Sequence, residues 1–290
     1  MTMKLLWLET LSSTHVGTGR GLGYIDLPLH REKVTGWPMI PGSSIKGVVA
    51  DSYQAGQKKR QGDREKERAF GIASDEAGQS RAGSLLFTDA RLVCLPVRSF
   101  TGTLAWCTTL PILQQIAREC HGPALPRDFG KKAAGVVDDS VLFTQVGQRK
   151  KVVVLEEYDL DAMHTPEVLV WADWIAGRLF PNQPEWQATF QKRFAILPED
   201  LFNHLTETGT EVVTRVRIDE ETGIVADGQL WTEESLPIGT ILLGMIACDP
   251  REGAQAQALL ETYASGEKNL QFGGKASVGR GRIRCVFGNP

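Results

Sequence analysis

Short apolar runs and helically spaced apolar residues alternate along this chain. Residues 3–8 form a nearly continuous apolar run, which predicts a buried first strand. After Ser43, which has the side chain of an N-cap, apolar residues recur at near-helical spacing and predict a helix that ends near Gly56. Residues 57–68 carry many charges and no apolar side chain, so we expect a solvated loop or a frayed helix there.

The same two patterns continue to the end of the chain. Residues 212–218 alternate apolar side chains with Arg or Thr, and the strand pattern returns at 224–231 after a turn at 219–223, which predicts a β-hairpin. This mixture is typical of an α+β protein, although the pattern alone does not fix the topology. Further strands are predicted at residues 85–87, 91–95, 103–109, 151–155, 238–247 and 283–287. Further helices are predicted at residues 110–120, 167–177 and 254–264.

Composition describes an ordinary globular protein. The 290 residues are 42% hydrophobic and 23% charged and could form one domain or two. No apolar stretch approaches membrane-spanning length and the sequence shows no leader pattern, so we expect no membrane partner. The five cysteines are odd in number and include no C-x-x-C pair, which favours reduced, buried thiols in the cytoplasm.

The net charge of −3 argues weakly against a nucleic-acid partner, but the distribution of charge changes the picture. Acids cluster at residues 156–161 and 233–234, whereas residues 268–290 contain none. A segment with local positive charge can bind RNA even when the net charge of the protein is negative. The C-terminal segment is therefore a candidate RNA contact. Its five basic residues are Lys268, Lys275, Arg280, Arg282 and Arg284.

Residues 14–47 carry the most informative pattern. Glycines alternate at Gly17, Gly19, Gly21 and Gly23, so the backbone there can turn freely and approach a ligand closely. A single acid, Asp26, follows, and a helix start with hydroxyls and a lysine comes soon after. This combination suits a phosphate-bearing polymer better than a small apolar ligand.

Asp26 is the first candidate for chemistry. A carboxylate on a flexible loop can bind a divalent cation or accept a proton during in-line cleavage of RNA. The alternative is an acid that only orders its own turn, and residue type alone favours that alternative. His15 and His30 could serve as acid or base partners, although a lone histidine is more often a structural residue.

Two further segments could bind anions. Ser43, Ser44 and Lys46 stand at the start of the first predicted helix, where free N–H groups attract phosphate, although a plain N-cap would also explain them. Residues 272–284 resemble a P-loop only superficially, because Arg280-Gly281 replaces Lys-Ser/Thr and a helix precedes rather than follows. We expect instead a glycine-rich loop that follows an RNA backbone.

One long motif carries a family resemblance. The pattern H-V-G-T-G-x-G-x-G-x-I-D-L-P-x-x-R-E-K-x-T-G-x-P-x-I-P-G-S-S-x-K-G at residues 15–47 resembles the N-terminal signature of the repeat-associated (RAMP) backbone subunits of type III CRISPR effector complexes. Its I-D-L-P-x-x-R-E part resembles the fourth subunit of the type III-B, or Cmr, complex. The likeness extends to residues 82–90, 215–237 and 272–282.

The resemblance implies a fold and an activity. It implies one RAMP domain over residues 1–290 with a ferredoxin-like, RRM-like palm, a charged insertion at 56–82 and an inserted β-hairpin thumb at 212–231. Such a subunit binds CRISPR RNA, stacks on further copies of itself beside other Cmr subunits, and cleaves complementary single-stranded target RNA. It is expected to be a metal-dependent endoribonuclease that uses a divalent cation, Mg²⁺ or Mn²⁺. A non-catalytic CRISPR-RNA-binding subunit remains the alternative, and a nucleotide-using enzyme is suggested by the glycines alone.

The resemblance also implies site residues. Asp26 becomes the catalytic residue and the expected cation ligand, with His15 and Glu233 in support. Family members often carry an aromatic residue where this chain has Ser235, which puts catalytic support from that position in doubt. The expected RNA-binding residues are Gly17, Gly19, Arg20, Ser43, Ser44, Lys46, Arg215, Arg217, Gly273, Gly274, Lys275, Arg280 and Arg282.

Overall fold

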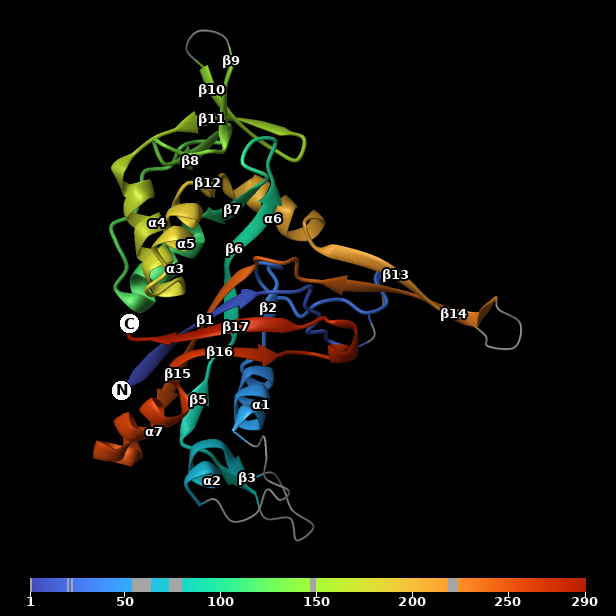
Figure 1. Ribbon diagram of the computed structural model, residues 1–290, viewed down its shortest axis with the longest axis vertical. Helices are drawn as coiled ribbons and strands as arrows, with labels where there is room; N and C mark the ends of the chain where they lie inside the picture. The colour runs from blue at the N-terminus through green and yellow to red at the C-terminus, as the bar shows by residue number, and fades with distance from the viewer. Residues whose placement is uncertain are drawn as a thin grey trace.

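The computed structural model describes residues 2–19, 21, 23–53, 64–72, 80–146, 150–218 and 224–290. Within these residues, thirteen strands form one mixed sheet (Figure 1). In spatial order its main strands are β16 (Gly266–Gln271), β17 (Arg282–Gly288), β1 (Met3–Thr10), β15 (Ile241–Cys248), β6 (Ala90–Arg98), β7 (Leu104–Thr109), β12 (Phe194–Leu197), β8 (Ala133–Val136), β11 (Tyr158–Met163), β10 (Lys150–Leu155) and β9 (Phe143–Val146). Beside this path, β2 (Met39–Ile40) pairs with β6, and β5 (Leu85–Phe87) pairs with β15.

The helices of the described residues cover this sheet. They are α1 (Gly42–Ser52), α2 (Arg64–Phe70), α3 (Leu110–Cys120), α4 (Pro166–Leu179), α5 (Pro184–Gln191), α6 (Glu199–Thr208) and α7 (Ala256–Tyr263). Two short 3-10 helices, η1 (Pro250–Gln255) and η2 (Ala276–Val278), precede α7 and β17. A small separate sheet pairs β3 (Gly71–Ile72) with β4 (Arg81–Ala82).

Strand β1 lies between β17 and β15 and pairs with both in the antiparallel sense. Leu5 and Trp7 belong to one hydrophobic core, whereas Leu6 and Leu8 belong to a second core. Successive side chains of a strand point to opposite faces, so a strand that is covered on both faces carries apolar residues without interruption. This explains why residues 3–8 show no polar alternation.

Different helices build the two cores. Helices α3, α4 and α6 enter the first core, through Ile116, Trp171 and Phe202 among others. Helices α1 and α7 enter the second core, through Val49 and Leu260 among others. Because α1 and α7 both pack in the second core, they lie on the same face of the sheet.

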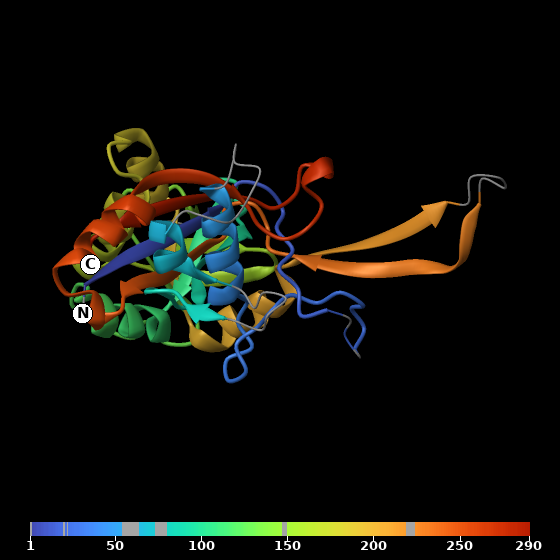
Figure 2. The same cartoon turned by 90° about the horizontal axis from the view of Figure 1, so that it is seen from below.

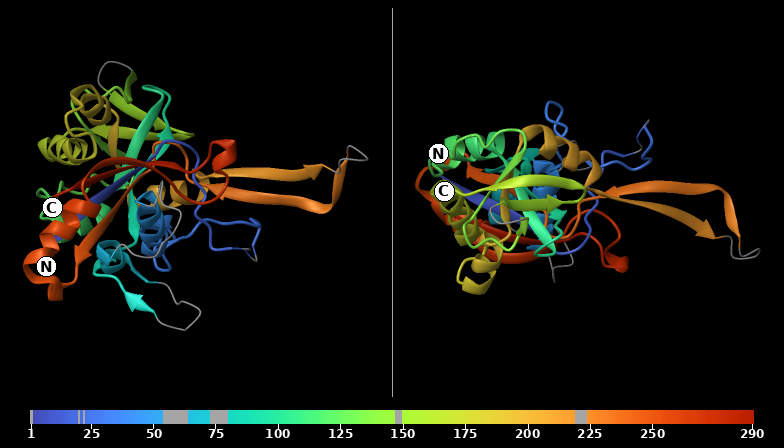
Figure 3. Two further views of the ribbon diagram at one scale, coloured as in Figure 1. Left: turned by 60° about the horizontal axis from the view of Figure 1, so that its bottom comes forward. Right: turned by 90° about the horizontal axis from the view of Figure 1, so that it is seen from above.

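Strands β13 (Glu211–Ile218) and β14 (Val225–Ser235) form an antiparallel hairpin of their own, in which Thr214 lies opposite Thr232. The hairpin projects from the body as a long ribbon, as Figure 2 shows from below. Figure 3 shows the same projection from two other directions. We call residues 211–215 and 231–235 the hairpin foot, and residues 216–218 and 224–230 the hairpin arm.

Most elements predicted from the sequence are confirmed, with small shifts at their ends. The five cysteines are all buried and free, as predicted. No helix in the described part of the chain is long and apolar enough to cross a membrane. The predicted turn at 219–223 and residues 57–63 of the charged run lie outside the described residues, whereas residues 64–68 belong to α2.

The predicted N-cap of the first helix is wrong. The N-cap residue is Pro41, so Ser43 lies inside the first turn, and α1 ends at Ser52 rather than near Gly56. The reason is a tertiary contact, because the backbone N–H of Gly42 donates to Asp89 Oδ1 at 2.8 Å. A carboxylate from another segment therefore does what a local side-chain cap would do.

Candidate functional site

Residues 14–31 form a loop that folds back on itself beside the hairpin foot (Figure 1). We call it the Asp26 loop; Arg20, predicted to bind RNA, and residue 22 lie outside the described residues. Two short bridges fix the loop to β14 and the residue after it. Thr14 pairs with Leu236, and Leu27 pairs with Glu233. The sequence therefore places its candidate carboxylate on a loop that the hairpin foot holds at two points.

Asp26 is exposed and contacts Thr232 of the hairpin foot. Its Oδ2 accepts a hydrogen bond from the backbone N–H of Thr232 at 2.7 Å and lies 2.9 Å from the Thr232 hydroxyl oxygen. The backbone N–H of Asp26 donates to the same hydroxyl at 3.0 Å. The carboxylate is thus fixed to β14 and does not only order its own turn.

Glu233, the next residue of β14, is buried with 1% of its side chain exposed. It forms ion pairs with Lys275 and, at 3.3 Å, with Arg215, and it accepts a bond from Trp231 Nε1 at 2.6 Å. Burial alone would raise the pKa of Glu233, but these hydrogen bonds and the two positive charges outweigh it and lower the pKa. Because two cations face one carboxylate, the cluster as a whole is positive.

Glu234 is a structural residue of this site that the sequence analysis left without a role. One of its oxygens contacts Arg31 at 2.5 Å and Thr210 Oγ1 at 2.8 Å, and the other accepts from the Leu29 N–H at 2.9 Å. Burial would raise the pKa of Glu234, but these donors and the Arg31 charge lower it instead. Glu234 therefore anchors the returning half of the Asp26 loop to β14.

His15 packs within the same group of contacts between the Asp26 loop and β14. Its Nδ1 lies 2.6 Å from the carbonyl oxygen of Glu234, and a carbonyl only accepts, so Nδ1 carries the proton. A Cβ on Gly17 would lie 2.4 Å from His15 Nε2, and a Cβ on Gly273 would lie 2.1 Å from the His15 carbonyl oxygen. At Gly273, where φ is 67°, a side chain would collide with backbone, and at Gly17 it would displace the His15 ring, so these glycines let the two glycine-rich segments close around His15. A supporting catalytic role for His15 stays a prediction.

The C-terminal glycine-rich loop, residues 272–282, completes the site. Lys275 has a left-handed backbone, with φ of 70°, and its ammonium reaches Glu233. Arg280 donates to the buried Ser235 hydroxyl at 3.1 Å, so the position without the family's aromatic residue is occupied by a polar contact. The backbone N–H of Arg282 donates to Ser12 Oγ at 2.9 Å, while its side chain is exposed.

The structure thus brings most of the predicted site residues close together and places a few of them elsewhere. Contacts link Asp26, Glu233 and His15, through Thr232 and the backbone of Glu234, to the residues of the C-terminal loop. Arg217 lies on the exposed hairpin arm, and Gly19 lies at an exposed turn with φ of 96°. Ser43, Ser44 and Lys46 lie on α1, whose later residues Val48 and Asp51 line a groove of about 740 Å³ against β16. Their RNA contacts stay predictions.

The donor set around Asp26 does not form a closed metal site. In the described part of the chain, no three His, Cys, Asp or Glu side chains gather in the way a bound ion requires. Glu233 and Glu234 directly follow Thr232 in the sequence. Their carboxylate oxygens, however, form ion pairs with Lys275, Arg215 and Arg31. One protein carboxylate fits only a cation that takes most of its ligands from RNA phosphates and water.

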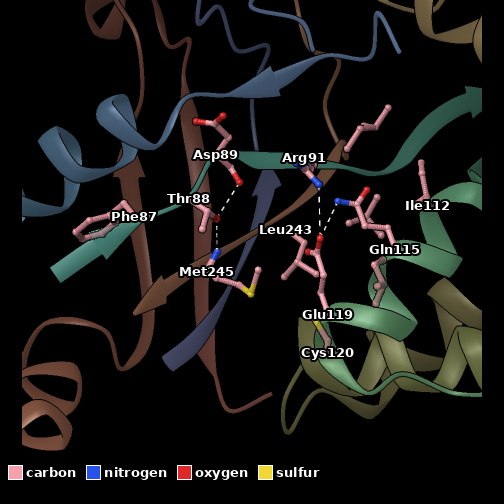
Figure 4. Close-up of a pocket in the computed structure, with 13 residues that line it drawn as sticks. Phe87, Thr88, Asp89, Arg91, Ile112, Gln115, Glu119, Cys120, Leu243 and Met245 are labelled. Carbon is pink, nitrogen blue, oxygen red and sulfur yellow. Dashed lines mark hydrogen bonds and ion pairs between the residues drawn. The ribbon is translucent and has the colours of Figure 1, made fainter. Parts of the chain in front are cut away.

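A pocket of about 460 Å³ lies elsewhere, between β6, β15 and α3 (Figure 4). On one side of the pocket, the Thr88 hydroxyl accepts a hydrogen bond from the Met245 N–H at 2.8 Å. On the other side, Arg91 forms an ion pair with Glu119 at 3.7 Å. Its lining includes none of the residues predicted for catalysis or RNA binding. The candidate site is therefore the surface around Asp26 and not this pocket.

Comparisons with known proteins agree with the motif. The family model of the RAMP superfamily matches residues 7–284. The CRISPR system Cmr endoribonuclease Cmr4 of Pyrococcus furiosus is 32% identical over 290 residues, which cover 99% of this chain and 96% of that protein.

Solved structures give the same result. The crystal structure of oligomeric Cmr4 from Pyrococcus furiosus matches with a TM-score of 0.76 and 25% identity, over 100% of this chain and 99% of that chain. A cryo-EM structure of the type III-B Cmr-beta complex bound to cognate target RNA contains a chain with the same fold, at a TM-score of 0.72 and 17% identity, over 99% of this chain and 97% of that one. This chain therefore belongs to the RAMP superfamily and, within it, to the family of the Cmr4 subunit of type III-B CRISPR complexes.

Proposed function

We propose that this chain is a backbone subunit of a type III-B CRISPR effector complex and cleaves target RNA that is complementary to the guide. It binds CRISPR RNA, stacks with further copies of itself and assembles with the other Cmr subunits. The relative that matches over the whole chain is named an endoribonuclease, and the matching structures include an oligomer and a complex with target RNA. Pairing with the guide supplies sequence choice, so the protein needs little base readout.

The observation that carries the cleaving role is the contact between Asp26 and Thr232. It holds an exposed carboxylate, by bonds of 2.7 and 2.9 Å, against the hairpin foot, where Arg215 and, from the C-terminal loop, Lys275 meet at Glu233. RNA that follows those cations passes beside the carboxylate. A binding subunit without activity would not need this geometry.

The topology supports a finer description of the fold. Strands β17, β1, β15 and β6 are adjacent and antiparallel, and α1 and α7 lie on one face of them. We propose that this unit is a ferredoxin-like palm within a single domain over residues 1–290. The hairpin β13–β14 is then the thumb, which displaces a base pair of the guide–target duplex. The charged insertion at 56–82 includes α2, β3 and β4 in its described part.

The RNA contacts follow from the placement of the basic residues. Lys275, Arg280 and Arg282 come from one loop, and Lys275 meets Arg215 across Glu233. We propose that this loop holds the guide backbone, since each phosphate neutralised by a cation releases a counterion. The buried Glu233 keeps Lys275 and Arg215 in place and is a positioning residue in this scheme.

The chemistry requires an in-line arrangement. The 2′-hydroxyl of the displaced nucleotide attacks the adjacent phosphorus, and the 5′-oxygen of the next nucleotide leaves. Asp26 accepts the proton of the attacking hydroxyl, and the positive charge of the neighbouring cluster stabilises the charge that develops on the phosphate. The hairpin foot supplies the orientation because it fixes the loop on which Asp26 lies.

We also propose that cleavage depends on a divalent cation, Mg²⁺ or Mn²⁺. Asp26 is its protein ligand and RNA phosphates supply further ligands. Such an ion stabilises charge on the phosphate when it is bound. Cleavage by the assembled complex should stop on chelation and return on addition of either metal, while guide RNA remains bound. Cleavage that continues in excess chelator would refute the metal requirement and leave the role of Asp26 untouched.

The direct test is Asp26→Ala in the assembled complex. We expect target cleavage to fall by at least about a hundredfold, while guide retention and assembly remain nearly as in the wild type. Asp159→Ala, which changes an exposed aspartate on β11, serves as the matched control and should cleave normally. Cleavage near the wild-type rate in Asp26→Ala would refute the catalytic assignment.

The non-catalytic alternative makes a different prediction. A wild-type complex that retains guide RNA and binds target, but cuts nothing with any divalent metal, would support it. The complex is expected in the cytoplasm, a placement supported by five free, buried cysteines.

A further inference from the structure

The hydroxyl of Thr232 lies close to three atoms of the Asp26 loop. Its oxygen lies 3.0 Å from the Asp26 backbone nitrogen, 2.9 Å from Asp26 Oδ2 and 3.3 Å from the Tyr24 carbonyl oxygen. A hydroxyl has one hydrogen and two lone pairs, so it accepts from the Asp26 N–H and donates to the nearer of the two oxygens, Asp26 Oδ2. The backbone N–H of Thr232 adds the bond of 2.7 Å to Oδ2.

Thr232 itself is held from both sides. The following residue, Glu233, is buried and paired with Lys275 and Arg215. The carbonyl oxygen of Thr232 accepts a hydrogen bond from the Leu27 N–H at 3.0 Å. The carbonyl oxygen of Leu27 in turn accepts one from the Glu234 N–H, also at 3.0 Å. The strand that presents Thr232 is therefore fixed before any RNA contacts the protein.

These contacts distinguish Thr232 from its neighbours. Thr214 lies directly opposite on β13 and is exposed, so it presents the same side chain on the other strand of the hairpin. The Asp26 carboxylate accepts hydrogen bonds from Thr232, on β14. Position on the ribbon alone therefore does not explain the arrangement.

We propose that Thr232 is a positioning residue for RNA cleavage, whose hydroxyl sets the orientation of the Asp26 carboxylate. The inference rests on the proposed function, because it takes Asp26 as the group that acts on RNA. The backbone N–H of Thr232 supplies one bond to the carboxylate. The hydroxyl supplies a second bond to it, which restricts the rotation of the carboxylate.

The test uses single-turnover cleavage of end-labelled target RNA by the assembled complex. Thr232→Val keeps the strand-compatible shape and the backbone N–H but removes the hydroxyl. We expect its cleavage rate to fall by about tenfold or more, because a misplaced catalytic group can cost about a hundredfold. Target affinity, guide retention and the spacing of the cuts should remain as in the wild type. Thr232→Ser, which restores the hydroxyl, should recover most of the lost rate.

Two further variants control for indirect effects. Thr214→Val makes the same chemical change on the opposite strand and should cleave like the wild type. Thr232→Val combined with Asp26→Ala should cleave no more slowly than Asp26→Ala alone, because a residue that acts through Asp26 has no effect once Asp26 is gone.

The outcomes separate this inference from the proposed function. If Asp26→Ala abolishes cleavage while Thr232→Val stays within about twofold of the wild type, the positioning role is wrong and the proposed function stands. Equal losses in Thr232→Val and Thr232→Ser would also overturn it, since the hydroxyl would then be irrelevant. If Asp26→Ala still cleaves, the proposed site itself fails, whatever Thr232 does.

Discussion

The two halves of one hairpin, its foot and its arm, have opposite chemistry. In the foot, Glu233, Glu234 and Ser235 are at most 2% exposed, and each polar side chain has a protein partner. In the arm, Val216 and Leu230 lie opposite each other and are 45% and 64% exposed. A two-stranded ribbon gains little stability by itself, so the foot must be held by the body.

This difference shows which part of the site is formed before RNA binds. The foot contacts the Asp26 loop and the C-terminal loop and fixes Asp26 in the isolated chain. The arm exposes apolar side chains that gain a partner only in an assembly, as the proposed contact with the guide–target duplex requires. Changes at the buried residues of the foot should therefore alter stability and chemistry, whereas changes in the arm should alter only the behaviour of the complex.

The largest effect is expected for Glu234→Ala in the foot. This change leaves Arg31 and Thr210 without their buried partner and should lower the free energy of unfolding by about 3 kcal/mol. Denaturant unfolding of the isolated chain measures it. Glu207→Ala, which changes an exposed glutamate of α6, is the control. A loss below about 1 kcal/mol would show that the foot is not the anchor described here.

A smaller effect is expected when the cations of the C-terminal loop are removed. Replacing Lys275, Arg280 and Arg282 together by Ala should weaken RNA binding by about tenfold to a hundredfold. The slope of log affinity against log salt should become shallower by about two, because each single-strand phosphate contact contributes about 0.7. Binding isotherms at several salt concentrations decide this. An unchanged slope would place the guide elsewhere on the protein.

The arm offers the contrasting variant. Val216→Thr with Leu230→Thr should change the free energy of unfolding by less than about 0.5 kcal/mol, because both side chains are exposed. Cleavage by the assembled complex should nevertheless fall severalfold. Unfolding and cleavage are measured on the same preparation. Loss of stability without loss of cleavage would reverse the assignment of foot and arm.

The smallest effect is expected for the loss of stability at acidic pH. The pKa of Glu234 is lower in the folded chain than its ordinary value of 4.5, so its contribution to stability is present above that value and lost as the pH falls through the folded pKa. The pKa of Glu9 is raised, chiefly by burial, so protonation of Glu9 acts in the opposite direction. Unfolding measured between neutral pH and about pH 3 should show a weaker acid destabilisation in Glu234→Gln than in the wild type. Parallel curves would contradict this role of Glu234.

Periodicity predicted the elements with a strong apolar pattern well. It predicted α3, α4, β1 and the last strand, since each buries a regular set of side chains. It also predicted the hairpin from its alternation, although most of the apolar side chains there are exposed. It missed β16, whose residues 266–271 are mostly polar because the strand lies at the edge of the sheet. It also missed β11, where two exposed acids flank the buried Leu160, and it missed β12 and α6. Such elements are stabilised by neighbours that are distant in the sequence.

The site was predictable in part for the same reason. The family motif indicated Asp26, and the basic C-terminal loop was visible from charge alone. The partners of these residues were not, because Thr232 and Glu234 meet the Asp26 loop, and Lys275 meets Glu233, only through the fold. The N-cap error at Ser43 has the same origin, since Asp89 caps α1 from another segment. Local sequence does not show which distant residue supplies a contact.

The central claim is that each subunit cuts target RNA once, at its own Asp26. The most direct measurement is a gel of end-labelled target cut by complexes assembled from wild-type chains, from Asp26→Ala chains, and from mixtures of the two. Wild-type complexes should give several evenly spaced cuts, pure Asp26→Ala complexes none, and mixtures the same positions with every band weakened in proportion to the variant. A single cut site in the wild type, or cleavage near the wild-type rate in pure Asp26→Ala complexes, would contradict the account.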